Sequence, residues 1–416
     1  MGTAPINPIS AGDTAWVLTS SALVLLMTAP GLAFFYGGMV RRKNILGVLM
    51  QCFMCLALIS VLWVVYGYSL AFGKGNPFIG GLDWFMLKGV GQEANPDYAA
   101  TIPHLAFMIF QAMFAVITPA LIIGSYAERM KFSSFLVFTA LWLTFVYCPI
   151  AHMVWGVGGW LNGLGAKDFA GGTVVHINAG VAGLVTALYL GKRVGTDKQG
   201  MHNVPFIILG ASLLWFGWFG FNAGSALAAN GLAAQAFVNT NTATAAAAIS
   251  WAVMEWIFTG KPTTLGAASG AVAGLVAVTP ACGFVDVSGA LWIGLLVSVL
   301  CYSMVAFVKP RLGYDDTLDA FGVHGIGGFW GAMATGLFAV KAINPSGGAD
   351  GLFAGNPGQV WVQFIACATT IAYTAIGTLI ICFVVDKVMG IRAQQDEEIM
   401  GLDLSQHHER AYTILD

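Results

Sequence analysis

Long apolar stretches separated by short polar turns are the feature that most constrains how this chain can fold. Of its 416 residues, 57% are hydrophobic and only 9% are charged, whereas soluble proteins carry about 25% charged residues. So little charge cannot cover a soluble surface of this size. Apolar runs longer than about 18 residues predict membrane-spanning helices rather than barrel strands. We therefore predict an all-α, polytopic membrane protein embedded in a lipid bilayer.

The number of apolar segments predicts how many helices cross the membrane. Polar and turn-forming sequences, such as RRKN at 41–44, separate one segment from the next. We expect a transmembrane domain over residues 1–385 and a cytoplasmic regulatory tail over 386–416, which is polar and charged. Eleven helices are predicted, over residues 14–39, 45–72, 101–125, 133–156, 169–191, 204–228, 235–259, 264–284, 289–308, 318–340 and 359–385.

The positions of the basic residues predict the orientation of the chain. If the loop at 41–44 lies inside and the loops alternate from there, the inside loops and the tail hold 14 of the 18 Lys and Arg. Cytoplasmic loops carry such an excess of positive charge. We predict an N-terminus outside and a C-terminus in the cytoplasm. The four outside residues are Lys74, Lys88, Lys167 and Lys341.

A weak internal repeat predicts two halves of opposite topology. Residues 168–184 (DFAGGTVVHINAGVAGL) and 321–337 (FGVHGIGGFWGAMATGL) share a Gly-rich pattern around a single His. Repeats over about 14–191 and 204–340 would hold five helices each, and an odd number inverts the second half. We therefore expect two inverted five-helix halves followed by a final helix at 359–385.

The two histidines of the repeat predict a site within the membrane, where a polar residue is costly. His176 follows Asp168 by eight residues, and His324 follows Asp316 by eight. This is about 12 Å of helix from opposite faces of a core about 30 Å thick, so both would lie near the midplane. They predict a narrow pore with a proton-relaying or hydrogen-bonding His pair. The alternatives are two core histidines, or a metal site that lacks an evident third ligand.

Aromatic residues and one hydroxyl gather at the predicted outer ends of three helices. An aromatic stripe is more often packing than a binding site. However, aromatic faces together with a hydroxyl acceptor suit a small cation that donates hydrogen bonds. The residues concerned are Phe107, Phe110, Phe114, Trp155, Phe221 and Ser225.

Other polar residues favour structural roles. Asp168 precedes Gly171 at the start of the fifth segment, which is typical of a helix N-cap, with a negative field that attracts cations as the alternative. Glu255 is expected to pair or to reach toward the interface. The Cys residues lie mostly in apolar runs and indicate core positions. We expect no enzyme activity, metal or cofactor, because no nucleotide or nucleophile motif has a suitable context. A net charge of -2 argues against nucleic acid as a partner.

Motifs spread over nearly the whole chain point to one known family. They include PGLAFFYGGMVRRKN (30–44), PIAHMVWG (149–156), DFAGGTVVHINAG (168–180), WFGFNAGSA (218–226) and FGVHGIGG (321–328). Together they resemble the ammonium transporter (Amt/Mep/Rh) family, close to its bacterial and archaeal Amt members.

The resemblance implies a homotrimer of the cell (inner) membrane with one pore in each protomer. It also implies that a PII-type signalling protein docks on the cytoplasmic face, although His408 stands where the tail motif usually has Gly. The implied site comprises an outer ammonium site of Phe110, Trp155 and Ser225, a gate of Phe114 over Phe221, a proton relay of His176 and His324, and the essential acidic residue Asp168.

Three functions are weighed on this basis. The first is a transporter that binds NH4+ or methylammonium outside, removes a proton and passes the neutral amine, with net transfer of the charged species. The second is an ammonium sensor that signals through the tail. The third is a proton-coupled metal channel or a passive gas channel.

Overall fold

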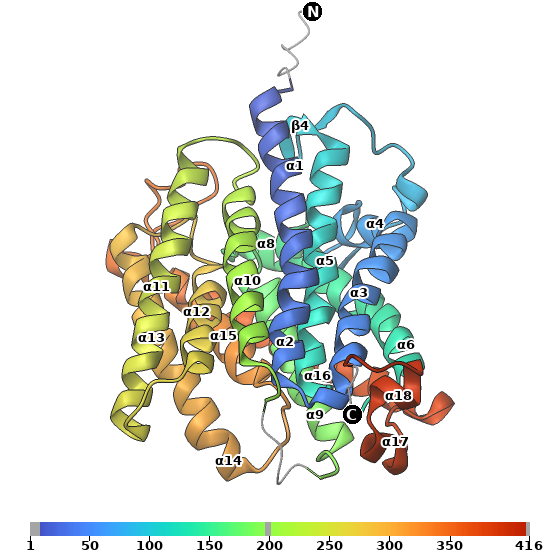
Figure 1. The fold of residues 1–416 in the computed structure, drawn as a ribbon. Coiled ribbons are helices and arrows are strands. Elements are labelled where there is room, and N and C mark those ends of the chain that lie inside the picture. The colour runs from blue at the N-terminus through green and yellow to red at the C-terminus, as the bar shows by residue number, and fades with distance from the viewer. Residues whose placement is uncertain (1–8, 196–200, 413–416) are drawn as a thin grey trace, which may run out of the picture.

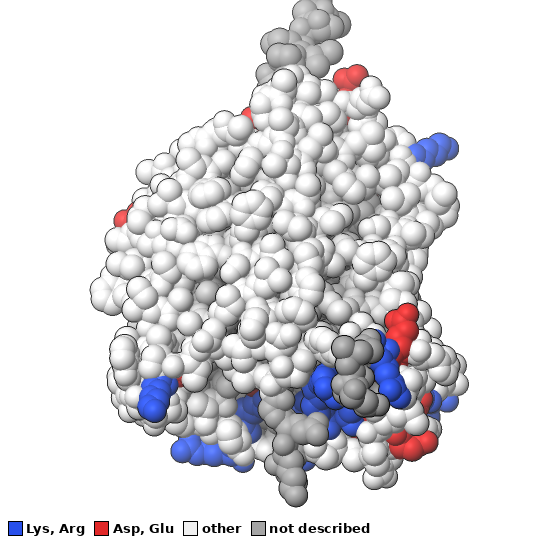
Figure 2. Space-filling model, in the orientation of Figure 1, with Lys and Arg blue, Asp and Glu red and all other residues white. Residues whose placement is uncertain are grey.

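The computed structural model describes residues 9–195 and 201–412 and is mostly helical. Its long helices stand side by side and form an upright bundle, with the start of the chain at one end and the tail at the other (Figure 1). The flanks of the bundle are almost free of charged side chains, whereas Lys and Arg gather at the tail end (Figure 2). Many large apolar side chains are exposed. A bundle with apolar flanks and polar ends suits a bilayer. We name the two ends the basic face and the opposite face.

A helical segment lies over each of the eleven predicted stretches. Among the described residues, eight helices are long and apolar enough to cross a membrane, so the count of eleven stays a prediction. Several segments contain a π-helical stretch, labelled η1, η3, η5, η6, η8 or η9. The segments are α1 (Ala11–Leu26) with η1 (Met27–Leu32) and α2 (Ala33–Met39); α3 (Ile45–Leu62) with η3 (Trp63–Gly67) and α4 (Tyr68–Phe72); α5 (His104–Tyr126); α6 (Phe132–Trp142) with η5 (Leu143–Tyr147) and α7 (Cys148–Trp155); η6 (Gly172–Ile177) with α9 (Asn178–Leu190); α10 (Val204–Gly224); α11 (Gly231–Thr259); α12 (Thr264–Val278); α13 (Val287–Ser303) with η8 (Met304–Val308) and α14 (Lys309–Leu312); η9 (Phe321–Gly325) with α15 (Ile326–Phe338); and α16 (Gly358–Met389).

Short elements occupy the loops and the tail. Two small antiparallel hairpins lie between α4 and α5, so the bundle is helical and the few strands are confined to a loop. The elements are η2 (Arg42–Asn44), β1 (Gly75–Asn76), β2 (Ile79–Gly80), η4 (Phe85–Leu87), β3 (Ala94–Asn95), β4 (Ala99–Pro103), α8 (Trp160–Leu164), η10 (Leu352–Ala354), α17 (Gln395–Met400) and α18 (Leu402–His407).

Some predicted helix ends are wrong, and local chemistry explains each difference. The third segment starts at His104 rather than 101, because Ala99–Pro103 pairs as strand β4. The fifth starts at Gly172, since Gly171 has a left-handed φ of 111° that a helix cannot continue through. The eighth ends at Val278, before Pro280, whose nitrogen has no hydrogen to donate to the helix.

Two further ends differ near the opposite face. The sixth segment ends at Gly224 rather than 228, and Leu227 takes a φ of 56°. The seventh begins at Gly231 rather than 235, because the side chain of Asn230 accepts hydrogen bonds from the backbone N–H groups of Leu232 and Ala233. Asn is a favoured N-cap for this reason.

The tail helices pack on the basic face against the start of α3. The Asp403 carboxylate accepts a hydrogen bond from the Gly47 N–H (2.8 Å), and the Asn44 side chain accepts one from the Leu402 N–H (2.8 Å). Arg392 donates to Glu398 (2.6 Å). The first two bonds join residues far apart in sequence, so the tail is held as part of the basic face. Tail residues 413–416 lie outside the described residues.

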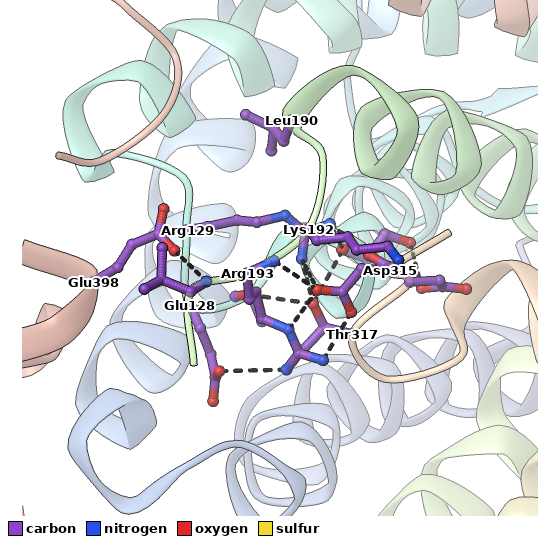
Figure 3. A network of polar contacts seen from close by, with 12 residues as sticks. Glu128, Arg129, Leu190, Lys192, Arg193, Asp315, Thr317 and Glu398 are labelled. Carbon is purple, nitrogen blue, oxygen red and sulfur yellow. Dashed lines mark hydrogen bonds and ion pairs between the residues drawn. The ribbon is translucent and has the colours of Figure 1, made fainter. Parts of the chain in front are cut away.

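A network of charged side chains joins the loops of the basic face (Figure 3). The Glu128 carboxylate accepts from Arg41 (2.7 Å) and Arg193 (3.3 Å). Arg193 also donates to both oxygens of Asp315 (2.8 and 2.9 Å), and Arg129 donates to Thr317 (2.8 Å). The network thereby connects the loops that follow α2, α5, α9 and α14. Lys198, counted as an inside residue, lies outside the described residues.

Candidate functional site

Two histidines meet in the middle of the bundle. His176 lies on η6 and His324 on η9, and the side chains are 0% and 3% exposed. Their Nδ1 atoms are 3.3 Å apart, and the rings are nearly parallel, with centroids 5.3 Å apart. Two neutral imidazoles bond through Nδ1 only if one carries its hydrogen on Nδ1 and the other on Nε2. A neutral pair would therefore consist of two unlike tautomers, with one Nδ1–H donating to the other Nδ1.

Small residues allow the helices that carry the histidines to touch. A Cβ on Gly180 would overlap the backbone nitrogen of Gly325, and one on Gly328 would lie 2.9 Å from the Cβ of His176. A larger residue at either position would force the two helices apart. The small-residue pattern predicted from the sequence is thus the contact that brings the rings together.

A buried aspartate caps each of these helices. Asp168 accepts four backbone hydrogen bonds of 2.7–3.0 Å, from the N–H groups of residues 171–174 at the start of η6. Asp316 accepts from the N–H groups of Ala320 (3.1 Å) and Phe321 (2.8 Å) at the start of η9. Each carboxylate satisfies donors that a helix start leaves unpaired. The capping interpretation of Asp168 is confirmed, and Asp316 has the matching role.

The environment of Asp316 alters its acidity. Burial is the main cause that raises the pKa of Asp316, to about 6, and the neighbouring Asp319 carboxylate adds to the shift. Lys309 opposes it and donates to the Asp316 carbonyl and to Asp319. The carboxyl that caps η9 is therefore a weaker acid than an ordinary Asp.

Aromatic rings stand between the histidines and the opposite face. Phe114 and Phe221 stack with centroids 4.3 Å apart. The Phe221 ring centroid lies 6.1 Å from that of His176, and the Trp218 ring stacks on His176 with centroids 5.3 Å apart. Trp218 is held by its indole N–H, which donates to Thr279 Oγ1 (2.8 Å). The Phe pair therefore packs directly beside the His176 ring.

A cavity of about 240 Å³ lies above the Phe pair, on the side of the opposite face, and we name it the vestibule. Trp155 lines it and packs edge-on against Phe114 at 5.7 Å. The Trp155 indole N–H donates to the Asp168 carbonyl (2.9 Å). The lining residues are Phe72, Asp97, Tyr98, Phe107, Gln111, Phe114, Trp155, Asp168, Phe169, Ser225 and Leu227.

The predicted outer residues are only partly brought together. Trp155 and Ser225 line the vestibule, whereas Phe110 is fully buried behind Phe114, at 5.0 Å between ring centroids. Sequence reasoning missed Gln111, whose buried Oε1 has no hydrogen-bond partner among the described residues. Gln111 lies one helical turn before Phe114, and this spacing would have placed both side chains on the same face of the helix.

A second cavity, of about 140 Å³, lies on the other side of the histidines and opens toward the basic face. His324 lines it, together with Tyr36, Glu255 and Asp319. Glu255 accepts from the N–H (2.6 Å) and the hydroxyl (2.9 Å) of Thr263, which agrees with the structural role predicted for it. The site therefore comprises two cavities separated by two aromatic rings and two imidazoles.

No group of three or more His, Cys, Asp or Glu side chains in residues 9–195 and 201–412 is arranged to hold a metal ion.

Comparisons with known proteins identify the fold and the family. The sequence model of the Ammonium Transporter Family matches residues 15–412. An ammonium transporter of Bacillus subtilis (strain 168) is 53% identical over 401 residues, which cover 96% of this chain and 98% of that protein. Ammonium transporter Amt1 of Archaeoglobus fulgidus is 50% identical over 409 residues, covering 97% and 100%.

Solved structures agree with these sequence matches. The crystal structure of Candida albicans Mep2 is 37% identical, with a TM-score of 0.88, and the match covers 94% of this chain and 88% of that one. A protein described as a sensor Amt protein is 28% identical, with a TM-score of 0.87 and coverage of 95% and 98%. The resemblance found in the motifs is confirmed, and the chain belongs to the ammonium transporter family.

Proposed function

We propose that this protein moves ammonium across the membrane by separating it into ammonia and a proton. NH4+ binds in the vestibule and loses a proton, and NH3 passes the Phe pair and the His pair to the second cavity. The observation that carries the proposal is the order of the features along one line: vestibule, Phe114 with Phe221, His176 with His324, and a cavity open to the basic face.

The vestibule has the chemistry of a small cation site. The Ser225 hydroxyl donates to the Phe221 carbonyl (2.8 Å), which leaves the lone pairs of its oxygen free to accept from ammonium. The Trp155 ring offers a π face to a positive charge. Phe110 supports the site from behind Phe114 rather than by contact. Asp168 lines the same cavity and adds negative charge, although its carboxylate is engaged by four backbone donors.

Deprotonation explains how the substrate passes an apolar constriction. A charge at the centre of a membrane costs about 2.5 kcal/mol or far more, whereas neutral ammonia avoids that cost. The proton is carried separately, by the imidazoles or by a chain of waters, and rejoins ammonia in the second cavity. The net species moved is then NH4+. Potassium has no proton to give up and is rejected on that ground.

The wider arrangement is proposed on the same basis. The excess of Lys and Arg supports a cytoplasmic basic face in the cell membrane, with the N-terminus outside. Two inverted halves over 14–191 and 204–340 are supported by the matched caps and His positions of η6 and η9. A homotrimer, and a PII-type protein docked on the basic face beside the tail, follow from family membership and are expected here.

The relatives favour transport over the other two functions. Proteins near 50% identity are named ammonium transporters, whereas the sensor Amt protein is 28% identical. A metal or passive gas channel would not need a hydrogen-bonded His pair below a cation site. Metal analysis of the purified protein, together with substrate-evoked currents, distinguishes these alternatives.

The test is to measure ammonium-evoked current in proteoliposomes on a supported membrane. His176→Ala and His324→Ala should reduce the current strongly or admit potassium, because the proton path or the selective neutral step is lost. His408→Asn, at an exposed tail position whose left-handed backbone Asn tolerates, is the matched control and should carry normal current. Unchanged currents and unchanged potassium exclusion in both pore variants would contradict the proposal.

A further inference from the structure

A third buried histidine lies beside the vestibule and has no part in the proposed pathway. His152 is 0% exposed and sits on α7, one helical turn before Trp155. It is near the opposite face, which the proposed orientation makes the outer side. Trp155 ends the same helix and lines the vestibule. A shift of His152 would therefore also shift Trp155.

The two contacts of the ring are those that a doubly protonated imidazole would make. His152 Nδ1 lies 3.0 Å from the carbonyl oxygen of Ala71, and Nε2 lies 3.0 Å from that of Asn76. A carbonyl oxygen has no hydrogen, so it can only accept. Both contacts are hydrogen bonds only when both ring nitrogens carry hydrogen, which is the imidazolium form. In a neutral ring one nitrogen lone pair would face a carbonyl oxygen at 3.0 Å, and that carbonyl would lose its donor.

The surroundings supply partial negative charge rather than a carboxylate. Ala71 is the last residue but one of α4 and Asn76 lies in β1, so one carbonyl at a helix end and one from the hairpin face the ring. Among the described residues no carboxylate oxygen lies within 4.0 Å of it. The titratable groups on the elements packed around it, none of which bonds the ring, are Tyr68, Lys74, Tyr147, Cys148 and His176.

The joint made by His152 connects two walls of the vestibule. Its partners belong to the end of α4 and to the β1–β2 hairpin, and Phe72 at the end of α4 lines the vestibule. The Tyr98 hydroxyl donates to the Phe72 carbonyl (2.5 Å) and accepts from the Val157 N–H (3.2 Å). The His152 and Tyr98 bonds together therefore connect α4, which carries Phe72, to the end of α7, which carries Trp155.

We infer that His152 is a positioning residue of the vestibule and that its protonation closes the joint between α4, the β1–β2 hairpin and α7. External acid holds the end of α4 and the β1–β2 hairpin against α7. Loss of the ring proton frees one of the two carbonyls and loosens that wall. The inference rests on the proposed function only in identifying the vestibule as the ammonium site.

The transport test measures two quantities at each external pH from about 5 to 8, the range in which an imidazole titrates. They are the ammonium concentration that gives half-maximal current and the maximal current itself. The wild-type protein should need about two- to tenfold more ammonium at the alkaline end, as expected for one lost hydrogen bond. His152→Gln should show a flat profile, because an amide does not titrate. His104→Gln, at another buried His on the same side that bonds Tyr68, is the control and should keep the wild-type profile.

A second measurement needs no transport and no variant. Hydrogen exchange of residues 71–80 in the wild-type protein, relative to the β3–β4 hairpin, should lose protection as pH rises through the same range. Relative protection that stays constant with pH overturns the inference. So does a wild-type pH profile of half-saturating ammonium in the His152→Gln variant. If the wild-type protein carries no ammonium current but residues 71–80 still show pH-dependent protection, the proposed function is overturned. The inference about His152 would still hold.

Discussion

His408 shows how one backbone angle constrains one residue of the tail. It follows α18 with a φ of 57° and a ψ of 29°, the left-handed region that costs most residues about 1 kcal/mol or more. Glycine adopts this conformation without strain. This explains physically why the tail motif usually has Gly at the position, and the His side chain is itself exposed.

We therefore expect His408→Gly to tighten the packing of the tail. The gain should be below about 1 kcal/mol, since glycine also makes the unfolded chain more flexible. Hydrogen exchange of residues 395–407 should slow in this variant. His407→Gly is the control, because it replaces a helical residue and should cost about 1 kcal/mol. Faster exchange in His408→Gly would show that the left-handed residue is not a source of strain.

At the scale of elements, the two helices that carry the paired histidines begin in the same way. Each starts with a π-helical stretch that follows a buried aspartate, and each continues as a 13-residue α-helix. Asp168 satisfies four N–H groups at once, whereas an ordinary cap such as Asp286 satisfies one backbone N–H at Gly289. The position of His176 therefore depends on a single carboxylate.

Asp168→Ala should destabilise the protein by more than the roughly 1 kcal/mol that an ordinary helix cap contributes. Four buried donors would lose their acceptor, and unpaired buried groups are costly. Asp168→Asn keeps one acceptor oxygen, so its stability should lie between those of the wild-type protein and Asp168→Ala. Thermal unfolding in detergent measures the effect, with Asp286→Ala as the single-bond control. Equal shifts for Asp168→Ala and Asp286→Ala would show that the cap is not exceptional.

At the scale of the whole molecule, the charged network ties together the loops that follow α2, α5, α9 and α14 on the basic face. Burial by itself would raise the pKa of Asp315, but the hydrogen bonds and charge of Arg193, with that of Arg129, outweigh it and lower the pKa to about 2. The carboxylate is thus more acidic in the folded protein than its ordinary value of 3.8. Ionised Asp315 consequently stabilises the fold.

This stabilisation should be present above about pH 4 and lost as the pH falls from about 4 to about 2. One pKa unit corresponds to about 1.4 kcal/mol, so the contribution is about 2 kcal/mol. The unfolding midpoint of the wild-type protein should fall across this window more steeply than that of Asp315→Asn, which has no charge to lose. Parallel curves for the two proteins would rule out Asp315 as a source of acid sensitivity.

The sequence by itself determined the helical membrane class, the family, and the places along the chain where helices lie. These follow from composition, run length and motifs, which need no knowledge of distant contacts. It also predicted the depth of His176 and His324, because helix rise converts a residue count into a distance. The capping role of Asp168 was readable from its place before a glycine pair.

Only the tertiary structure decided which of these residues meet. The 3.3 Å contact between the histidines, the stacking of Phe114 on Phe221, and the partners of His152 join residues from separate segments. Local sequence carries no record of such pairings. Helix ends such as those at Gly172 and Val278 were also missed, because a left-handed glycine or a turn after the helix is decided by packing. Side chains on different helices share a site only once the backbones between them have been placed.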